Sequence, residues 1–63
     1  MTDIETTWTP SFVLVCARSA VGRAWCYRNI DAERWVPTPV DHRYIADIVN
    51  GARADGLTVE TTN

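Results

Sequence analysis

The sequence predicts a small α+β domain with a three- to four-stranded, mostly antiparallel sheet in the order β-β-β-α-β and one amphipathic helix packed on one face. Hydrophobic residues make up 46% of the 63 residues and charged residues 22%, a balance typical of a globular chain. β-Branched and apolar residues fill two short segments, 11–18 and 23–30, as they do in strands. One segment nearer the C-terminus repeats apolar side chains at helical spacing.

The first ten residues are expected to form a flexible N-terminal arm. They are polar and rich in Thr apart from Ile4 and Trp8, and Pro10 closes them. Such a segment stays mobile unless its aromatic side chain docks on the folded part. The domain itself is therefore expected to span residues 11–61, followed by a frayed C-terminus at residues 62–63.

The segments 11–18 and 23–30 are predicted to pair as a hairpin, with Gly22 as the left-handed residue of a short turn. This register places Cys16 opposite Cys26. Because successive strand residues point to opposite faces, each face of the hairpin carries an apolar set. One set is Phe12, Leu14, Cys16, Ala24, Cys26 and Ile30, and the other is Val13, Val15, Ala17, Trp25 and Tyr27.

Residues 33–36 are predicted to form a short third strand that ends at Pro37. A helix is expected to start at Thr38, to keep its apolar register past Gly51, and to end near Ala54, with Gly56 as its stop signal. Its apolar face is Val40, Tyr44, Ile45, Ile48, Val49 and Ala52. Residues 57–61 then read as the last strand, with Leu57 and Val59 facing inward.

Charge and hydropathy predict a cytoplasmic protein with no membrane contact. Eight acidic residues oppose six basic ones, all of them Arg, so the net charge is −2. The N-terminus lacks the positive start and apolar run of a signal peptide. The longest apolar run, residues 12–17, is far shorter than the roughly 20 residues that span a bilayer.

The positions of Cys16, Cys26 and His42 predict no metal, cofactor or catalytic residue. Structural zinc needs four ligands, usually in closely spaced pairs, whereas the two cysteines lie ten positions apart. Nucleophilic catalysis needs a positioned base and an orienting group, and the chain has a single His. A non-enzymatic protein is therefore expected, whose two cysteines are either buried free thiols or a cross-strand disulfide.

The two apolar faces of the predicted hairpin indicate a protein-binding module. One helix covers one face, so the N-terminal arm, a second copy in a homodimer or a target protein must cover the other. Large aromatic side chains dominate binding energy at such interfaces. The expected partner-binding residues are Trp8, Val13, Val15, Trp25, Tyr27 and Trp35.

Size and the lack of catalytic groups suggest a more specific hypothesis. Chains this short are often inhibitors or accessory proteins of phages and mobile elements, including anti-defence and anti-CRISPR proteins, which act by covering a partner surface. No family motif supports this association, which rests on size and the absence of catalytic groups.

The alternative hypothesis is a small nucleic-acid-binding domain that uses Arg and aromatic side chains. Its expected contacts are Arg43 and Arg53, on the predicted helix. The overall negative charge disfavours this alternative, because nucleic-acid binding needs a clustered positive surface.

Overall fold

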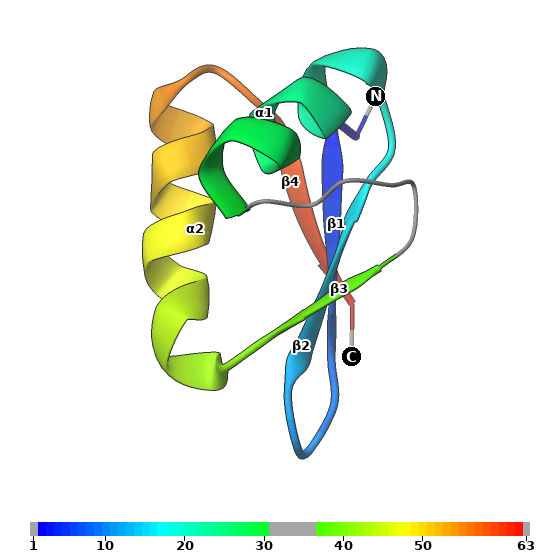
Figure 1. Ribbon diagram of the computed structural model, residues 1–63, viewed down its shortest axis with the longest axis vertical. Helices are drawn as coiled ribbons and strands as arrows, with labels where there is room; N and C mark the ends of the chain where they lie inside the picture. Colours follow the sequence, from blue (N-terminus) through cyan, green and yellow to red (C-terminus); the bar gives the residue numbers. More distant parts are fainter. Residues whose placement is uncertain (1, 31–36, 63) are drawn as a thin grey trace.

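A computed structural model describes residues 2–30 and 37–62 of the chain (Figure 1). Four strands form one mixed sheet, and two helices accompany it. This arrangement confirms the predicted α+β class. The elements follow one another as β1 (Ile4–Trp8), β2 (Val13–Ala17), α1 (Ala20–Ile30), β3 (Thr38–Val40), α2 (His42–Ala54) and β4 (Val59–Thr62).

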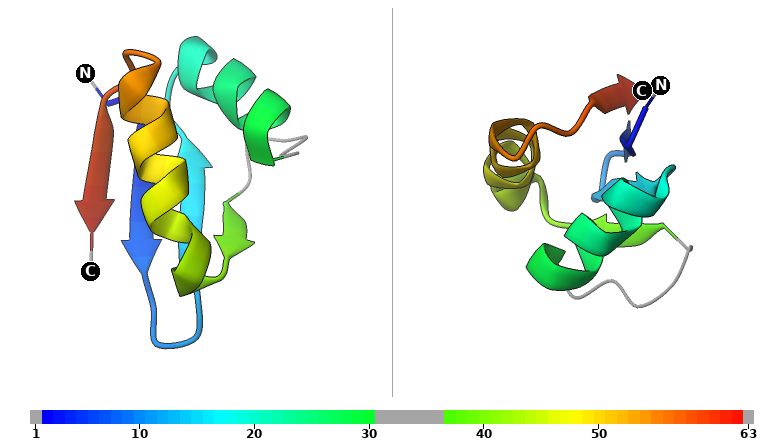
Figure 2. Two further views of the ribbon diagram at one scale, coloured as in Figure 1. Left: turned by 90° about the vertical axis from the view of Figure 1, so that its left-hand side faces the viewer. Right: turned by 90° about the horizontal axis from the view of Figure 1, so that it is seen from above.

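The strands lie in the order β3-β2-β1-β4, which differs from the order of the elements along the chain. The β1–β2 and β2–β3 pairs are antiparallel, whereas β1 and β4 run parallel. Most of the sheet is thus antiparallel, as predicted. α2 packs on one face of the sheet and runs roughly along the strands, and α1 follows the end of β2 (Figure 2).

The N-terminal segment is not a flexible arm, because residues 4–8 form the inner strand β1. A tight turn joins it to β2: the Thr9 amide donates to the carbonyl oxygen of Phe12 at 2.9 Å, and Pro10 occupies the position that proline favours in such turns. The folded domain therefore begins well before residue 11. At the other end, Thr62 belongs to β4, and Asn63 lies outside the described residues.

The predicted strand over residues 23–30 is wrong, because this segment belongs to helix α1. Ser19 caps the helix: its hydroxyl accepts a hydrogen bond from the Gly22 amide at 2.9 Å. The predicted hairpin partner of β2 is therefore replaced by β1, and Cys16 faces Glu5 instead of Cys26. The described residues thus form two helices, whereas the sequence predicts one.

The predicted second half of the domain is largely confirmed. The helix continues through Gly51 and ends at Ala54, and Gly56 follows with a positive φ of 88°. Leu57 and Val59 are buried, as expected, but the last strand covers Val59–Thr62 instead of residues 57–61, so Leu57 lies before it.

The start of this helix lies later than predicted. Asp41 is the cap, and its carboxylate accepts a hydrogen bond from the Arg43 amide at 2.9 Å. Thr38 belongs instead to β3, which pairs with β2. The predicted strand over residues 33–36 lies outside the described residues.

The core lies between one face of the sheet and the two helices. Alternate residues of the strands point into it, and Trp25, Cys26, Ile45 and Ala52 meet them from the helices. Thr6 is fully buried among them, and its hydroxyl lies 3.2 Å from that of Thr61. The strand residues in this core are Ile4, Val13, Val15, Ala17 and Val59.

Asp3 connects three elements at one end of the sheet. Its carboxylate accepts hydrogen bonds from the Ser19 hydroxyl at 2.7 Å and from the Thr58 amide at 3.0 Å. Its backbone carbonyl accepts from the Arg18 amide at 2.8 Å. The start of β1 is thereby joined to the N-terminus of α1 and to the segment that leads into β4.

Gly22 and Gly51 should respond in opposite ways to alanine. A Cβ at Gly22 would lie 2.0 Å from the backbone oxygen of Asp3, so Gly22→Ala should destabilise the domain by at least about 1–3 kcal/mol. A Cβ at Gly51 would lie 3.5 Å from the Trp25 ring, an ordinary contact, and alanine favours the helix by about 0.5–1 kcal/mol. Urea unfolding followed by circular dichroism measures both changes, and a Gly22→Ala protein as stable as the parent would contradict this packing.

Asp3 should make the stability of the domain fall at acidic pH. The hydrogen bonds from the Thr58 amide and the Ser19 hydroxyl lower the pKa of the Asp3 carboxyl. A carboxyl whose pKa is lower in the folded state stabilises the fold above its unfolded pKa, near 4, and loses this contribution as the pH falls through the folded value.

The free energy of unfolding, measured by urea titration between pH 2 and pH 6, tests this dependence. Asp3→Asn should flatten the decline below about pH 4. Asp47→Asn, on the exposed surface of α2, is the matched control. An unchanged acid decline in Asp3→Asn would show that other carboxyls determine it.

Candidate functional site

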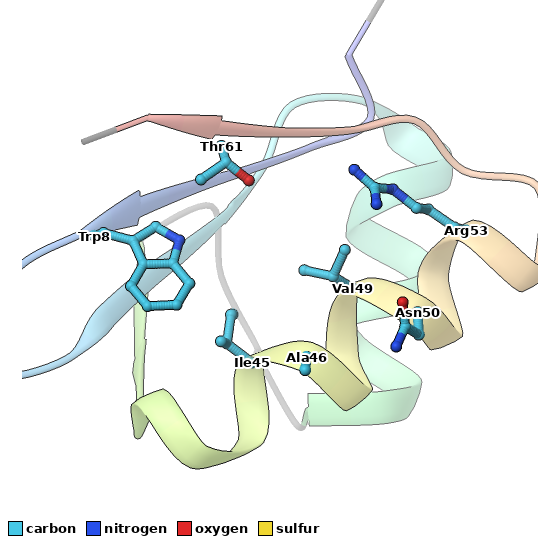
Figure 3. Close-up of a pocket in the computed structure, with 7 residues that line it drawn as sticks. All are labelled: Trp8, Ile45, Ala46, Val49, Asn50, Arg53 and Thr61. Atoms are coloured by element: carbon cyan, nitrogen blue, oxygen red, sulfur yellow. The ribbon is translucent and has the colours of Figure 1, made fainter.

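A groove of about 310 Å³ lies between α2 and the strands β1 and β4 (Figure 3). One side chain at the end of β1 and one on β4 line it from the sheet side. Five side chains from successive turns of α2 line the other side. Its lining residues are Trp8, Ile45, Ala46, Val49, Asn50, Arg53 and Thr61.

Trp8 forms one end of the groove. It lies on the same sheet face as Ile4 and Thr6, but at the end of β1, where 39% of its surface stays exposed. Its indole stacks on the His42 ring, with the ring centres 5.2 Å apart and the planes inclined by 13°. The His42 Nε2–H donates to the Thr9 carbonyl oxygen at 2.8 Å, which fixes the ring against the indole.

Arg53 lies toward the other end of the groove, with Val49 between it and Trp8 (Figure 3). Within the part of the chain that the structure describes, its guanidinium makes no hydrogen bond or ion pair. The amide of Asn50 lies beside it on the same side of α2. The groove thus combines an aromatic wall and an apolar floor with one cation and one amide.

The predicted partner-binding residues are separated by the fold. Val13, Val15 and Trp25 are buried in the domain's own core, with at most 4% of their surface exposed, so the face expected to need a partner is covered by the two helices. Tyr27 is exposed on α1, away from the groove. Trp35 lies outside the described residues. Of the five predicted residues that the structure describes, only Trp8 lines the groove.

The two arginines of the nucleic-acid hypothesis lie in different surroundings. Arg43, in the first turn of α2, pairs with the Asp41 carboxylate and lies over the ring of Tyr44. The hydrogen bonds that Arg43 donates lower the pKa of the Asp41 carboxyl. Arg53 lies near the end of the helix, in the groove. Sequence reasoning selected Arg53, but for a different class of partner.

The cysteines and His42 do not come together. Cys16 alternates with the buried residues of β2 and so lies on the opposite face of the sheet, whereas His42 lies against Trp8. Both cysteines are free thiols, and burial raises the pKa of Cys26. In residues 2–30 and 37–62, no three His, Cys, Asp or Glu side chains gather into a group that could hold a metal.

Trp25 and Trp8 should differ strongly in their effect on stability. The Trp25 indole is buried and donates to the Asp55 carboxylate at 2.7 Å, so Trp25→Ala should cost about 3–5 kcal/mol, which is enough to unfold a domain of this size. Trp8→Ala removes a half-exposed ring and one stack and should cost less than about 2 kcal/mol. Thermal unfolding followed by circular dichroism separates the two, and an unfolded Trp8→Ala protein would contradict the exposed position of this ring.

Comparisons with protein families, with curated proteins and with solved structures found no match to this chain. No helix among the described residues is long and apolar enough to cross a membrane. Function is therefore argued from the residues of the groove.

Proposed function

We propose that the protein is a non-enzymatic protein-binding module that contacts its partner through the groove between α2 and β4. The observation that carries this proposal is the half-exposed indole of Trp8 at the end of an apolar floor. An indole with an apolar floor beside it and a guanidinium further along is the combination that supplies most of the binding energy at protein interfaces. A partner side chain that enters the groove removes this apolar surface from water.

The exposure of the groove supports a protein partner over an enclosed small ligand. Its volume lies near the lower limit of small-molecule pockets, which enclose most of their ligand. Five of its lining residues, Trp8, Ala46, Asn50, Arg53 and Thr61, are themselves exposed. Such a surface suits one or two side chains that project from a larger molecule.

The biological role we propose is that of an inhibitor or accessory protein that covers a surface of its partner. At 7.1 kDa the domain is small compared with a typical protein domain, and the groove lies between α2 and the strands β1 and β4. Blocking a partner needs no chemistry, only a stable interface. Self-association through the same groove is a second form of the proposal, in which the partner is another copy.

Nothing in the arrangement of arginines favours nucleic acid. Arg43 is engaged by Asp41, and the exposed Asp47 lies on the helix between Arg43 and Arg53. The chain has a net charge of −2, and Arg43 and Arg53, the two arginines expected to contact a phosphate backbone, lie ten positions apart on α2.

A Trp8→Ala variant should lose partner binding while the domain stays folded. The immobilised wild-type protein should retain a protein from a lysate of its source cells. The purified partner should then bind the variant at least about tenfold more weakly by calorimetry, because an anchor residue contributes about 1.4 kcal/mol or more. Tyr44→Ala, which removes an exposed aromatic residue of α2 outside the groove, should bind like the wild type.

Three results would contradict the proposal. One is equal affinity of the wild type and Trp8→Ala for the retained protein. Another is retention that disappears on nuclease treatment and weakens steeply with salt, which would indicate nucleic acid. The third is a wild-type protein that retains nothing and stays at 7.1 kDa by light scattering at all concentrations.

A further inference from the structure

The two edges of the sheet differ in their capacity to accept another strand. β3, at one edge, has only three residues, and Pro39 at its centre has no amide hydrogen to donate. β4, at the other edge, has four residues without proline and, among the described residues, pairs with β1 alone. An additional strand can therefore bind at β4 and not at β3.

The backbone groups of β4 that face this open edge can be assigned. The Ile4 amide donates to the Thr58 carbonyl oxygen at 3.1 Å. In a parallel ladder the inward and outward residues alternate, so the amide and carbonyl groups of Glu60 and Thr62 turn toward β1. The amide and carbonyl groups of Val59 and Thr61 then turn outward, where an added strand would pair with them.

The groove runs beside this same edge. Thr61 contributes both an outward backbone group and a side chain that lines the groove. α2 runs antiparallel to β4. The residues of α2 that line the groove therefore lie along β4, between the Trp8 end of the groove and the Arg53 end (Figures 1 and 3). Alternate side chains of a strand added to β4 would point to the helix side of the sheet and reach the groove.

Charge and spacing specify which side chains fit. Val49 and Arg53 are four residues apart on α2, a rise of about 6 Å, and alternate side chains of a strand are about 6.6 Å apart. If an apolar side chain of the added strand contacts Val49 and Trp8, the side chain two residues later points to the same face of the sheet and lies close to Arg53. Because the Arg53 guanidinium has no described ion-pair partner, a carboxylate is the complementary group there.

We propose that the partner of this protein binds as an extended segment that adds antiparallel to the open edge of β4 and places an apolar side chain in the groove and, two residues later, an Asp or Glu side chain on Arg53. The inference rests on the proposed protein-binding function and names the form of the partner. Antiparallel addition is the more stable pairing, and it runs from the Trp8 end of the groove toward Arg53. Main-chain hydrogen bonds supply affinity in this mode, and the groove supplies selectivity.

Selection from a displayed library of random heptapeptides with amidated C-termini tests the inference. Amidation removes the terminal carboxylate, so any acidic preference must come from a side chain. We expect enrichment of the pattern apolar-x-acidic within otherwise β-branched sequences. A synthetic peptide of the enriched sequence should lose about tenfold in affinity when its acid is replaced by the amide. The absence of enriched peptides, or enrichment without an acid, overturns the inference.

Matched variants locate the bound peptide. Arg53→Gln should abolish the difference between the acidic peptide and its amide, whereas Arg43→Gln, on the same helix but paired with Asp41, should preserve it. In the wild type, the peptide should slow amide hydrogen exchange of Val59 and Thr61, the outward groups of β4. Unchanged exchange at these two amides would place the peptide elsewhere and refute the added strand.

The outcomes separate this inference from the proposed function. If a folded partner depends on Trp8 but no peptide is selected, protein binding through the groove stands and the added strand fails. If neither the partner nor the peptide responds to Trp8→Ala, both proposals fail.

Discussion

The position of β1 inside the sheet is the constraint on which the rest of the structure depends. This strand is the only link between the antiparallel pair β2–β3 and the parallel strand β4 in the described sheet. The Asp3 carboxylate holds its start, because it accepts hydrogen bonds from both the α1 cap residue Ser19 and the Thr58 amide before β4. The approach of Gly22 to the Asp3 backbone completes this junction, where a larger residue would not fit. The N-terminal residues therefore determine where a helix and a distant strand meet the sheet.

The groove also depends on the position of β1 inside the sheet. Trp8 comes from the N-terminal strand and Thr61 from the C-terminal one, and α2 supplies the remaining lining residues. The two strands are paired by the parallel backbone ladder, and the hydroxyl of Thr6, which is fully buried, finds its partners in the Thr61 hydroxyl and the carbonyl oxygen of Glu60. A buried hydroxyl without a partner would destabilise the pairing, so this contact favours the observed register. The groove and the fold thus depend on the same strand pair, β1 and β4, and a substitution that separates these strands would disrupt both.

Sequence reasoning succeeded where a periodic pattern decides the structure and failed where tertiary contacts decide it. The helix over residues 42–54 was predictable because its apolar residues repeat on one face. α1 was not, because its apolar residues surround the helix, and aromatic and β-branched residues are also typical of strands. β1 was missed because its central buried residue is Thr6, a polar side chain whose burial depends on a partner more than fifty positions away. At the site, Trp8 and Arg53 were each selected for different partners, and only the topology shows that they share one groove.

The position of one exposed apolar ring, Trp8, bears on the kind of partner that we propose, because this ring lies at the end of the groove beside β4. The face of the sheet away from the helices carries Glu5, which pairs with Arg18 at 2.6 Å, and Thr7 on β1, together with the part-buried Leu14 and Cys16 of β2. The exposed large apolar side chains of the described residues are Trp8, Phe12, Val21, Tyr27 and Tyr44, and of these only Trp8 lines the groove beside the described outer edge of β4. An extended ligand can bury an apolar side chain in the groove and also form main-chain hydrogen bonds with the neighbouring edge of β4. A folded surface without a free strand could bury the side chain but could not form these main-chain hydrogen bonds. This coincidence of groove and edge, and not the total amount of apolar surface, is the feature that points to an extended partner.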